Sequence, residues 1–193
     1  MAPTIAELAA QRLPQTFFAR PAATVARALI GCALVHRRRA GLIVETEAYV
    51  GEHDAACHAR SGVTARNAVL FGSGGVSYVY LIYGIHEMFN IVTGVEGNGE
   101  AVLIRAVAPL VGLGDDVAIG RGPGKVTKAL ALDRRHDRRD LARGALFVAR
   151  YRSPPRGAIA RGPRIGIDYA GAWAAKPLRF WWRGDPSVSR SPG

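Results

Sequence analysis

The sequence is poor in cysteine, in lysine and in long apolar runs, and each shortage removes a class of protein. Cys32 and Cys57 are its two cysteines, too few for a disulfide framework or a four-cysteine zinc site. We interpret them as reduced, partly buried thiols. The longest uncharged stretch, residues 67–85, is long enough to cross a bilayer, but its four glycines and three tyrosines favour two strands and a loop.

The rest of the composition is that of an ordinary globular domain. The chain has 193 residues, of which 49% are hydrophobic and 21% charged, so it can bury a core of its own as one domain. Glu7 and Arg12 interrupt the N-terminal region, which has no signal-peptide core. We expect a soluble, cytoplasmic protein without a membrane segment, with an N-terminal segment over 1–14, a domain over 15–188 and a loose tail over 189–193.

The charge is strongly basic and is carried almost entirely by arginine. The formal net charge is +11, and only three of the 26 cations are lysines. The guanidinium fork binds phosphate and carboxylate bidentately, which suits a polyanionic partner such as nucleic acid or an anionic membrane surface. A GC-rich coding sequence would produce the same excess of arginine, so the charge alone does not identify the partner.

Hydrophobic patterns and turn residues predict more strands than helices. Helices are predicted over residues 5–10, 24–30 and 125–132, the second capped by Thr24. Strands are predicted over residues 32–35, 42–50, 77–82, 85–92, 101–107, 145–149 and 177–182. Most of these strands are joined by short turns, for example at Tyr83 and Gly84. The pattern therefore indicates an α+β fold, a single mixed domain with a largely antiparallel sheet flanked by helices.

Two glutamates stand out in the predicted strand 42–50. Strand alternation places Ile43, Glu45, Glu47 and Tyr49 on one face, with the two carboxylates about 7 Å apart. Repulsion between close carboxylates raises the pKa of one of them, which prepares a general acid or base. Residues 40–59 contain no Lys or Arg in this basic chain, although a solvent-facing strand with ordinary charges would give the same pattern.

Patterns for metals and nucleotide phosphates are incomplete. His53, Asp54, Cys57 and His58 are of ligand type but match no zinc signature. The glycine-rich run 119–126 lacks the first Gly and the final Ser or Thr of a Walker A loop. Its backbone N–H groups before a helix would still suit a phosphate, and a purely structural turn explains it equally well. We expect no metal and no cofactor.

Four of the six tyrosines fall within 35 residues. Tyr78 and Tyr80 share a face of the predicted strand 77–82, and Tyr83 is placed at the tip of the hairpin. Core packing is the usual explanation of strand tyrosines. An aromatic at an exposed turn of an arginine-rich chain also suits stacking on nucleic-acid bases or wedging between them.

These residues resemble a family when they are taken together. The segments 44–49, 54–58, 64–67, 78–84 with Asn90, 103–106, 122–125 and 176–180 look like the alkyladenine (3-methyladenine) DNA glycosylases, in the family's order, from about residue 15 to 188. The resemblance implies a curved antiparallel sheet and a monomer acting on double-stranded DNA with damaged purines. It implies a monofunctional enzyme that flips the base out and hydrolyses its N-glycosidic bond, starting base excision repair.

The resemblance also implies roles for particular residues. Glu47 would be the general base that activates water, and Arg105 would hold the backbone of the flipped nucleotide. Tyr83 would be the wedge that fills the gap in the duplex. The implied base pocket is formed by Tyr49, His58, Tyr80 and Asn90. The implied contacts to the DNA backbone are made by Arg66 and Lys125. Departures from the family pattern, which bear on substrate range, occur at Cys57, Leu70, Ser73 and His86.

Two other functions remain compatible with the sequence. One is a non-catalytic protein that binds damaged nucleic acid, against which the intact Glu47 argues. The other is a nucleoside N-glycosidic hydrolase, against which the +11 charge and the wedge-like Tyr83 argue. Release of bases from alkylated duplex, from free nucleosides, or from neither distinguishes the three.

Overall fold

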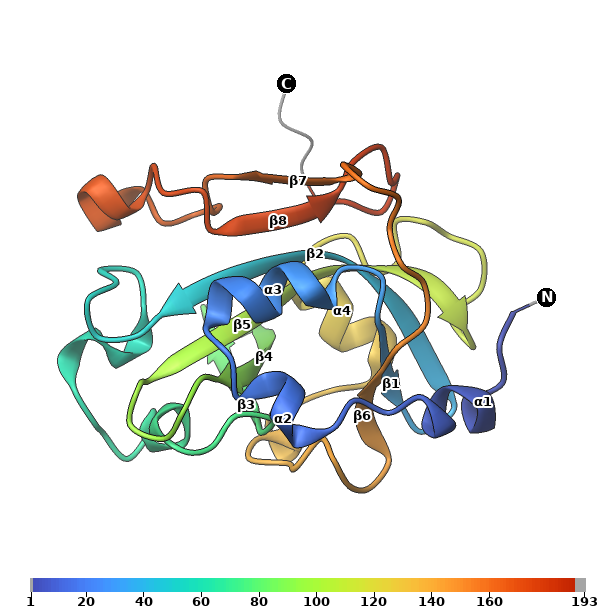
Figure 1. The fold of residues 1–193 in the computed structure, drawn as a ribbon, viewed down its shortest axis with the longest axis horizontal. Helices are drawn as coiled ribbons and strands as arrows, with labels where there is room; N and C mark the ends of the chain where they lie inside the picture. The colour runs from blue at the N-terminus through green and yellow to red at the C-terminus, as the bar shows by residue number, and fades with distance from the viewer. Residues whose placement is uncertain (1, 190–193) are drawn as a thin grey trace.

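The computed structural model describes residues 2–189, which fold around an antiparallel sheet that curls into a half-barrel (Figure 1). The strands are β1 (Ala33–His36), β2 (Arg39–Val50), β3 (Ser77–Ile82), β4 (His86–Thr93), β5 (Glu100–Val111), β6 (Leu146–Ala149), β7 (Ile159–Gly162) and β8 (Arg179–Trp182). Their order is β3-β4-β5-β2-β1-β6, and β8 pairs with both β2 and β7. The long strands β2 and β5 pair in the middle and form the frame of the sheet.

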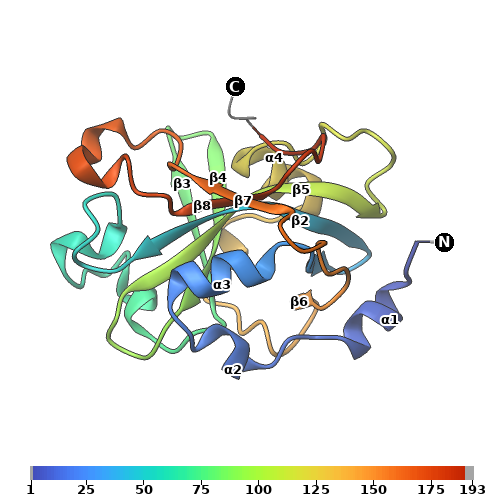
Figure 2. The same ribbon diagram turned by 45° about the horizontal axis from the view of Figure 1, so that its top comes forward.

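Short helices pack around this sheet. They are α1 (Ile5–Ala10), α2 (Gln15–Phe18), α3 (Ala22–Leu29) and α4 (Pro123–Leu130), with the 3₁₀ segments η1 (His58–Ser61), η2 (Ala68–Phe71), η3 (Arg134–His136) and η4 (Asp168–Trp173). Helix α3 lies across one face of the sheet (Figure 2). The Thr46 hydroxyl of β2 donates to the carbonyl of Ala26 at 2.9 Å, which fixes α3 on the strand that carries the two glutamates.

The predicted architecture is confirmed. Every strand pairing among residues 2–189 is antiparallel, as the succession of hairpins indicated. Strand β3 has the predicted bounds, and its hairpin with β4 turns at Tyr83 and Gly84. Helix α1 also has the predicted bounds, because Thr4 and Glu7 form a capping box that fixes its start.

Two helices are among the predicted elements that differ from the structure at their ends, and one strand was missed. Helix α3 begins after Pro21, whose fixed φ suits a helix start, so Thr24 lies inside the helix and does not cap it. Helix α4 begins at Pro123 and ends at Leu130, two residues earlier than predicted at each end. The missed strand is β7, a short and partly exposed edge strand next to Pro163.

The predicted faces of β2 are wrong at its start. The register with β5 shifts between Ile43 and Glu45, and again between Glu45 and Thr46, which marks a β-bulge. Ile43 consequently lies in the main core, while Val44 packs with Trp181 of β8. The members of the predicted face that stay together are Glu45, Glu47 and Tyr49.

Both ends of the described chain are packed against the sheet. Leu8 of α1 is buried with Phe147 of β6, and Leu13 donates its backbone N–H to the carbonyl of Val148 at 2.8 Å. Near the other end, Val188 is buried and Ser189 donates its backbone N–H to Glu45 at 2.7 Å. The predicted loose tail is therefore wrong at residue 189, and its remainder, 190–193, lies outside the described residues.

The cysteines are free thiols, and both are buried more deeply than predicted. Burial raises the pKa of Cys32 to about 11 and also raises the pKa of Cys57, so both thiols stay protonated near neutral pH. Among the described residues, no helix has the length and apolar character needed to cross a membrane.

Candidate active site

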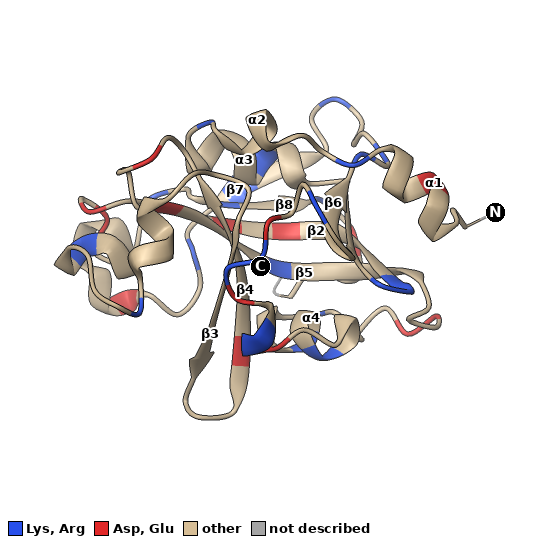
Figure 3. Ribbon diagram, turned by 90° about the horizontal axis from the view of Figure 1, so that it is seen from below, with Lys and Arg blue, Asp and Glu red and all other residues tan. Residues whose placement is uncertain are grey.

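The two glutamates of β2 are completely buried. Neither Glu45 nor Glu47 has exposed side-chain area, so the explanation of a solvent-facing strand is wrong. Acidic positions of β2 lie at the centre of the molecule, beside a basic position on β5 (Figure 3). Buried carboxylates persist only with charged or hydrogen-bonding partners, and the partners of the two glutamates differ.

Glu47 is held by three donors from three parts of the chain. The Tyr49 hydroxyl donates to Oε2 at 3.0 Å, and the Ile165 backbone N–H donates to Oε1 at 2.8 Å. The Arg105 guanidinium lies 3.4 Å from Oε1. Burial raises the pKa of Glu47, and these three donors oppose that rise. The predicted rise of a glutamate pKa is therefore right. Burial is its main cause, and repulsion from Glu45 contributes least among the causes identified.

Glu45 has a different set of partners and does not line the cavity beside Glu47. Its Oε1 lies 3.2 Å from Arg105 Nε and 3.2 Å from Arg179 Nη1, while its Oε2 accepts from Ser189 N–H at 2.7 Å. Arg105 thus bridges the two carboxylates. Glu45 fixes the position of Arg105, and of the two carboxylates only that of Glu47 lines the cavity.

A cavity of about 150 Å³ opens beside Glu47. Three tyrosines, one histidine and one asparagine from different elements line it: Tyr49, His58, Tyr78, Tyr80 and Asn90. Four of these five were predicted as the base pocket, and the structure brings them together. Leu70 and Cys57, two of the noted departures from the family pattern, also line it. Flat aromatic walls and a carboxylate at one end suit a planar, electron-poor ligand.

His58 packs edge to face on two tyrosine rings, and the tyrosine hydroxyls keep their protons. The His58 ring lies 4.5 Å from the ring of Tyr80, and His58 Nδ1 is 2.9 Å from the Tyr78 hydroxyl. Burial lowers the pKa of His58, so its imidazole is neutral near pH 7. Burial raises the pKa of Tyr78 to about 12 and raises those of Tyr49 and Tyr80. The hydroxyls therefore remain hydrogen-bond donors.

A buried ion pair supports the Tyr49 wall from behind. Arg164 meets Asp54 with two hydrogen bonds of 2.5 and 2.8 Å, and neither side chain is exposed. The guanidinium carbon of Arg164 lies 4.7 Å from the centre of the Tyr49 ring. Asp54 was noted as a residue of metal-ligand type, and in the structure it fixes Arg164 against this ring.

The remaining predicted residues lie around the cavity. Tyr83 is 85% exposed at the hairpin tip and does not line the cavity. Arg66 lies at its edge, with its guanidinium carbon 5.8 Å from the Tyr80 ring centre. Lys125 lies in the first turn of α4, and Pro123, two residues before it on that helix, lines the cavity. Tyr169 of η4, a 72% exposed aromatic that was not among the predicted site residues, also lines the cavity.

The other missed residues follow the glutamates by more than 110 positions in the sequence. Ile165 acts through its backbone N–H, which leaves no trace in side-chain identity. Arg164, Arg179 and Ser189 each contact a buried carboxylate, but nothing local separates these arginines from the others. Among residues 2–189, no group of three or more His, Cys, Asp or Glu side chains could hold a metal ion.

These features suit an enzyme that receives a flat aromatic group beside a buried carboxylate. Residues 16–186 match the family model described as methylpurine-DNA glycosylase. The chain therefore belongs to the methylpurine-DNA glycosylase family, as the resemblance indicated. It is a repair enzyme that hydrolyses the N-glycosyl bonds of alkylated purines in DNA.

Curated relatives are similar along nearly the whole chain. A protein of Myxococcus xanthus is 53% identical over 184 residues, which is 93% of this chain and 94% of the relative. One of Anaeromyxobacter dehalogenans is 53% identical over 186 residues, and one of Legionella pneumophila is 42% identical over 185 residues. These alignments cover 94% of this chain in both cases, and 87% and 100% of the relatives. Each relative is named, provisionally, a 3-methyladenine DNA glycosylase.

Proposed function

We propose that this glycosylase acts on 3-methyladenine and related alkylated purines in duplex DNA, with Glu47 as the general base. The observation that carries the proposal is the Glu47 carboxylate, buried at one end of an aromatic cavity and held by Tyr49, Ile165 and Arg105. The names of the relatives point to the same substrate.

In the proposed step, Glu47 takes a proton from a water molecule as the water oxygen attacks C1′ of the flipped nucleotide. The C1′–N bond breaks, and its electron pair leaves with the base. A purine that carries a positive charge from alkylation departs neutral and needs no proton donor. The oxocarbenium-like charge that develops on the sugar is stabilised by the nearby carboxylate.

The cavity favours such a base over an ordinary one. Cationic rings stack well on tyrosine faces, and Tyr49 and Tyr80 line the pocket. Asn90 is buried and donates through Nδ2 to the carbonyls of Tyr78 and Met88, so its amide is fixed as a polar wall. We assign Asn90 the rejection of normal purines that do not fit this wall.

Tyr83 supplies the proposed wedge. Removing a base from the stack costs a few kcal/mol, and less for damaged bases that pair poorly. The backbone φ of Tyr83 is 53°, in the left-handed region, which directs a large exposed side chain outward at the tip of the β3–β4 hairpin. Ile85 beside it is 69% exposed, and apolar tips of this kind enter base steps.

Water is the proposed nucleophile because no amine of residues 2–189 lines the cavity. A glycosylase that also cuts the strand uses an amine to form a Schiff base at C1′, and no lysine lines this cavity among residues 2–189. Reaction with alkylated duplex should release the base and leave the strand intact, with no protein–DNA adduct trapped by borohydride. Release from free nucleosides, or strand cleavage without added alkali, would contradict the proposal.

A further inference from the structure

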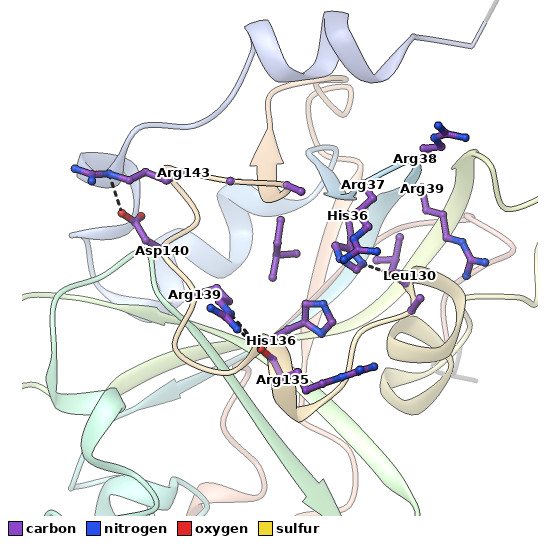
Figure 4. Close-up of a pocket in the computed structure, with 14 residues that line it drawn as sticks. His36, Arg37, Arg38, Arg39, Leu130, Arg135, His136, Arg139, Asp140 and Arg143 are labelled. Carbon is purple, nitrogen blue, oxygen red and sulfur yellow. Dashed lines mark hydrogen bonds and ion pairs between the residues drawn. The ribbon is translucent and has the colours of Figure 1, made fainter.

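A second and larger concavity lies at the other end of β2. It has a volume of about 960 Å³ and shares no lining residue with the cavity at Glu47. The turn between β1 and β2, the end of α4 and the loop over 135–146 form its walls (Figure 4). We call it the arginine groove after the six arginines that line it: Arg37, Arg38, Arg39, Arg135, Arg139 and Arg143.

Most of the positive charge of the arginine groove is not balanced by the protein. Arg135 pairs with Asp133 at 2.6 Å, and Arg143 pairs with Asp140 at 3.4 Å. The other four arginines of the groove have no carboxylate within ion-pair distance among the described residues. Like charges crowded in one concavity repel one another and attract a polyanion.

Two of these arginines are held in fixed positions by backbone carbonyls. Arg39 donates through Nη1 to the carbonyl of Ala129 at 2.9 Å. Arg139 donates through Nε and Nη2 to the carbonyl of Arg135 at 3.1 and 2.8 Å. Each guanidinium has five N–H donors, so most of its donors remain for a ligand. These two side chains already have little conformational freedom, because the carbonyls hold them.

The floor of the groove is formed by two histidine rings. His36 is buried and donates through Nδ1 to the carbonyl of Leu130 at 2.8 Å, and its ring lies 4.5 Å from the ring of His136 (Figure 4). Burial is the main cause that lowers the pKa of His36, and the charges of Arg37 and Arg39 add to it. The imidazole of His36 is therefore neutral near pH 7, and the arginines on the walls carry positive charge.

Arg37 also occupies a strained backbone position. Its φ is 56° at the turn between β1 and β2, in the left-handed region that glycine and asparagine adopt at lower cost. Backbone conformations of this kind cost free energy and cluster at functional sites. The side chain here is 1 of 3 consecutive arginines, all exposed.

We propose that the arginine groove binds nucleic-acid phosphates, as a second contact beyond the duplex around the flipped base. Guanidinium forks match phosphate oxygens in planar, bidentate geometry. The groove is remote from the reacting base, because the eight residues from Arg39 to Glu47 span about 26 Å along β2. It also adjoins the base of the β3–β4 hairpin, where Ser77 donates to the carbonyl of Arg139 at 2.9 Å, and not the Tyr83 tip.

The test removes charge from the groove and, in a matched control, from elsewhere. The groove variant is R37N/R38Q/R39Q, and the control variant R156Q/R161Q/R183Q removes the same charge from exposed positions outside both concavities. Binding of undamaged duplex is measured by anisotropy against salt concentration, with duplexes of about one and about four helical turns. Base release from a saturating alkylated one-turn duplex is measured in parallel.

The groove variant should bind the four-turn duplex at least about tenfold more weakly at low salt, with a log–log salt slope that falls by about 0.9 for each phosphate that the protein no longer neutralises. The control variant should change little, and saturated base release should stay within about twofold of wild type. Weaker binding confined to the four-turn duplex places the phosphates on the same DNA. If the groove variant instead fails to bind a second equivalent of the one-turn duplex, the phosphates belong to a second DNA molecule.

Equal weakening of DNA binding in the groove and control variants would overturn the proposal. Occupation of the groove by tripolyphosphate that leaves DNA binding unchanged would also overturn it. Arg37→Asn alone keeps the test sound, because asparagine relieves the left-handed strain and should melt no lower than wild type while still weakening binding. The outcome is independent of the assigned chemistry, since an error about Glu47 changes base release and leaves the salt slope untouched.

Discussion

The cavity at Glu47 and the arginine groove handle charge in opposite ways. The cavity is small, about 150 Å³, and its charged groups are buried with partners, whereas the groove is about 960 Å³ and crowds exposed cations with few partners. Burying a charge without partners costs a prohibitive amount of free energy, whereas exposed charges are screened by water and salt. The smaller concavity is thus where burial changes the basicity of a carboxylate, and the larger one is suited to attracting a polyanion.

The sharpest contrast is between two Arg–Asp pairs. Asp54→Asn would leave Arg164 buried and charged without its partner, and should destabilise the fold by about 3–5 kcal/mol, lowering the melting temperature by on the order of 10 °C. Asp133→Asn breaks the exposed pair with Arg135 in the groove and should change the melting temperature far less, because solvent screens that pair. Equal shifts in thermal unfolding would contradict the contrast.

The next largest effect is on the rate of base release. Glu47→Gln should lower the single-turnover rate at least about a hundredfold, the scale expected on removal of a general base, while duplex binding is retained. Glu45→Gln should cost less, because Glu45 does not line the cavity and acts by positioning Arg105. Equal reductions of rate in the two variants would show that the roles have been assigned wrongly.

The pH dependence of base release tests the effect of burial on Glu47. The reaction needs the carboxylate, and burial raises the pKa of Glu47 above its ordinary value of 4.5. The single-turnover rate should therefore fall as the pH drops through a value above 4.5, and the residual rate of Glu47→Gln should lack this limb. A wild-type rate that stays flat down to pH 4.5 would be inconsistent with the raised pKa.

A smaller effect concerns stability. Because the pKa of Glu47 is raised on folding, its contribution to stability is fully present below the unfolded pKa and is lost as pH rises through the folded pKa. Glu47→Gln should therefore melt at or slightly above the wild-type temperature at pH 8, and the gain should vanish toward pH 4.5. Arg37→Asn provides the comparison from the groove, where any gain should not depend on pH.

Local sequence patterns predicted the elements that carry the site, but not the contacts that complete it. The β3–β4 hairpin is evident from its turn and alternation, so Tyr80, Tyr83 and Asn90 could be placed in advance. The bulge at Glu45 could not, because register depends on pairing with β5 and not on the strand itself. The N–H of Ile165 was equally hidden, since a backbone donor has no side-chain signature.

The hydrogen bond from Ser189 to Glu45 joins residues 144 positions apart. Ser189 also accepts from Arg105 through its hydroxyl at 3.1 Å, so it completes the set of groups around the two carboxylates. During synthesis on the ribosome, β2 and β5 emerge long before residue 189. An elongating chain therefore carries the two carboxylates without the hydrogen bonds of Ser189. The full set of contacts around them forms only after residue 189 has left the exit tunnel.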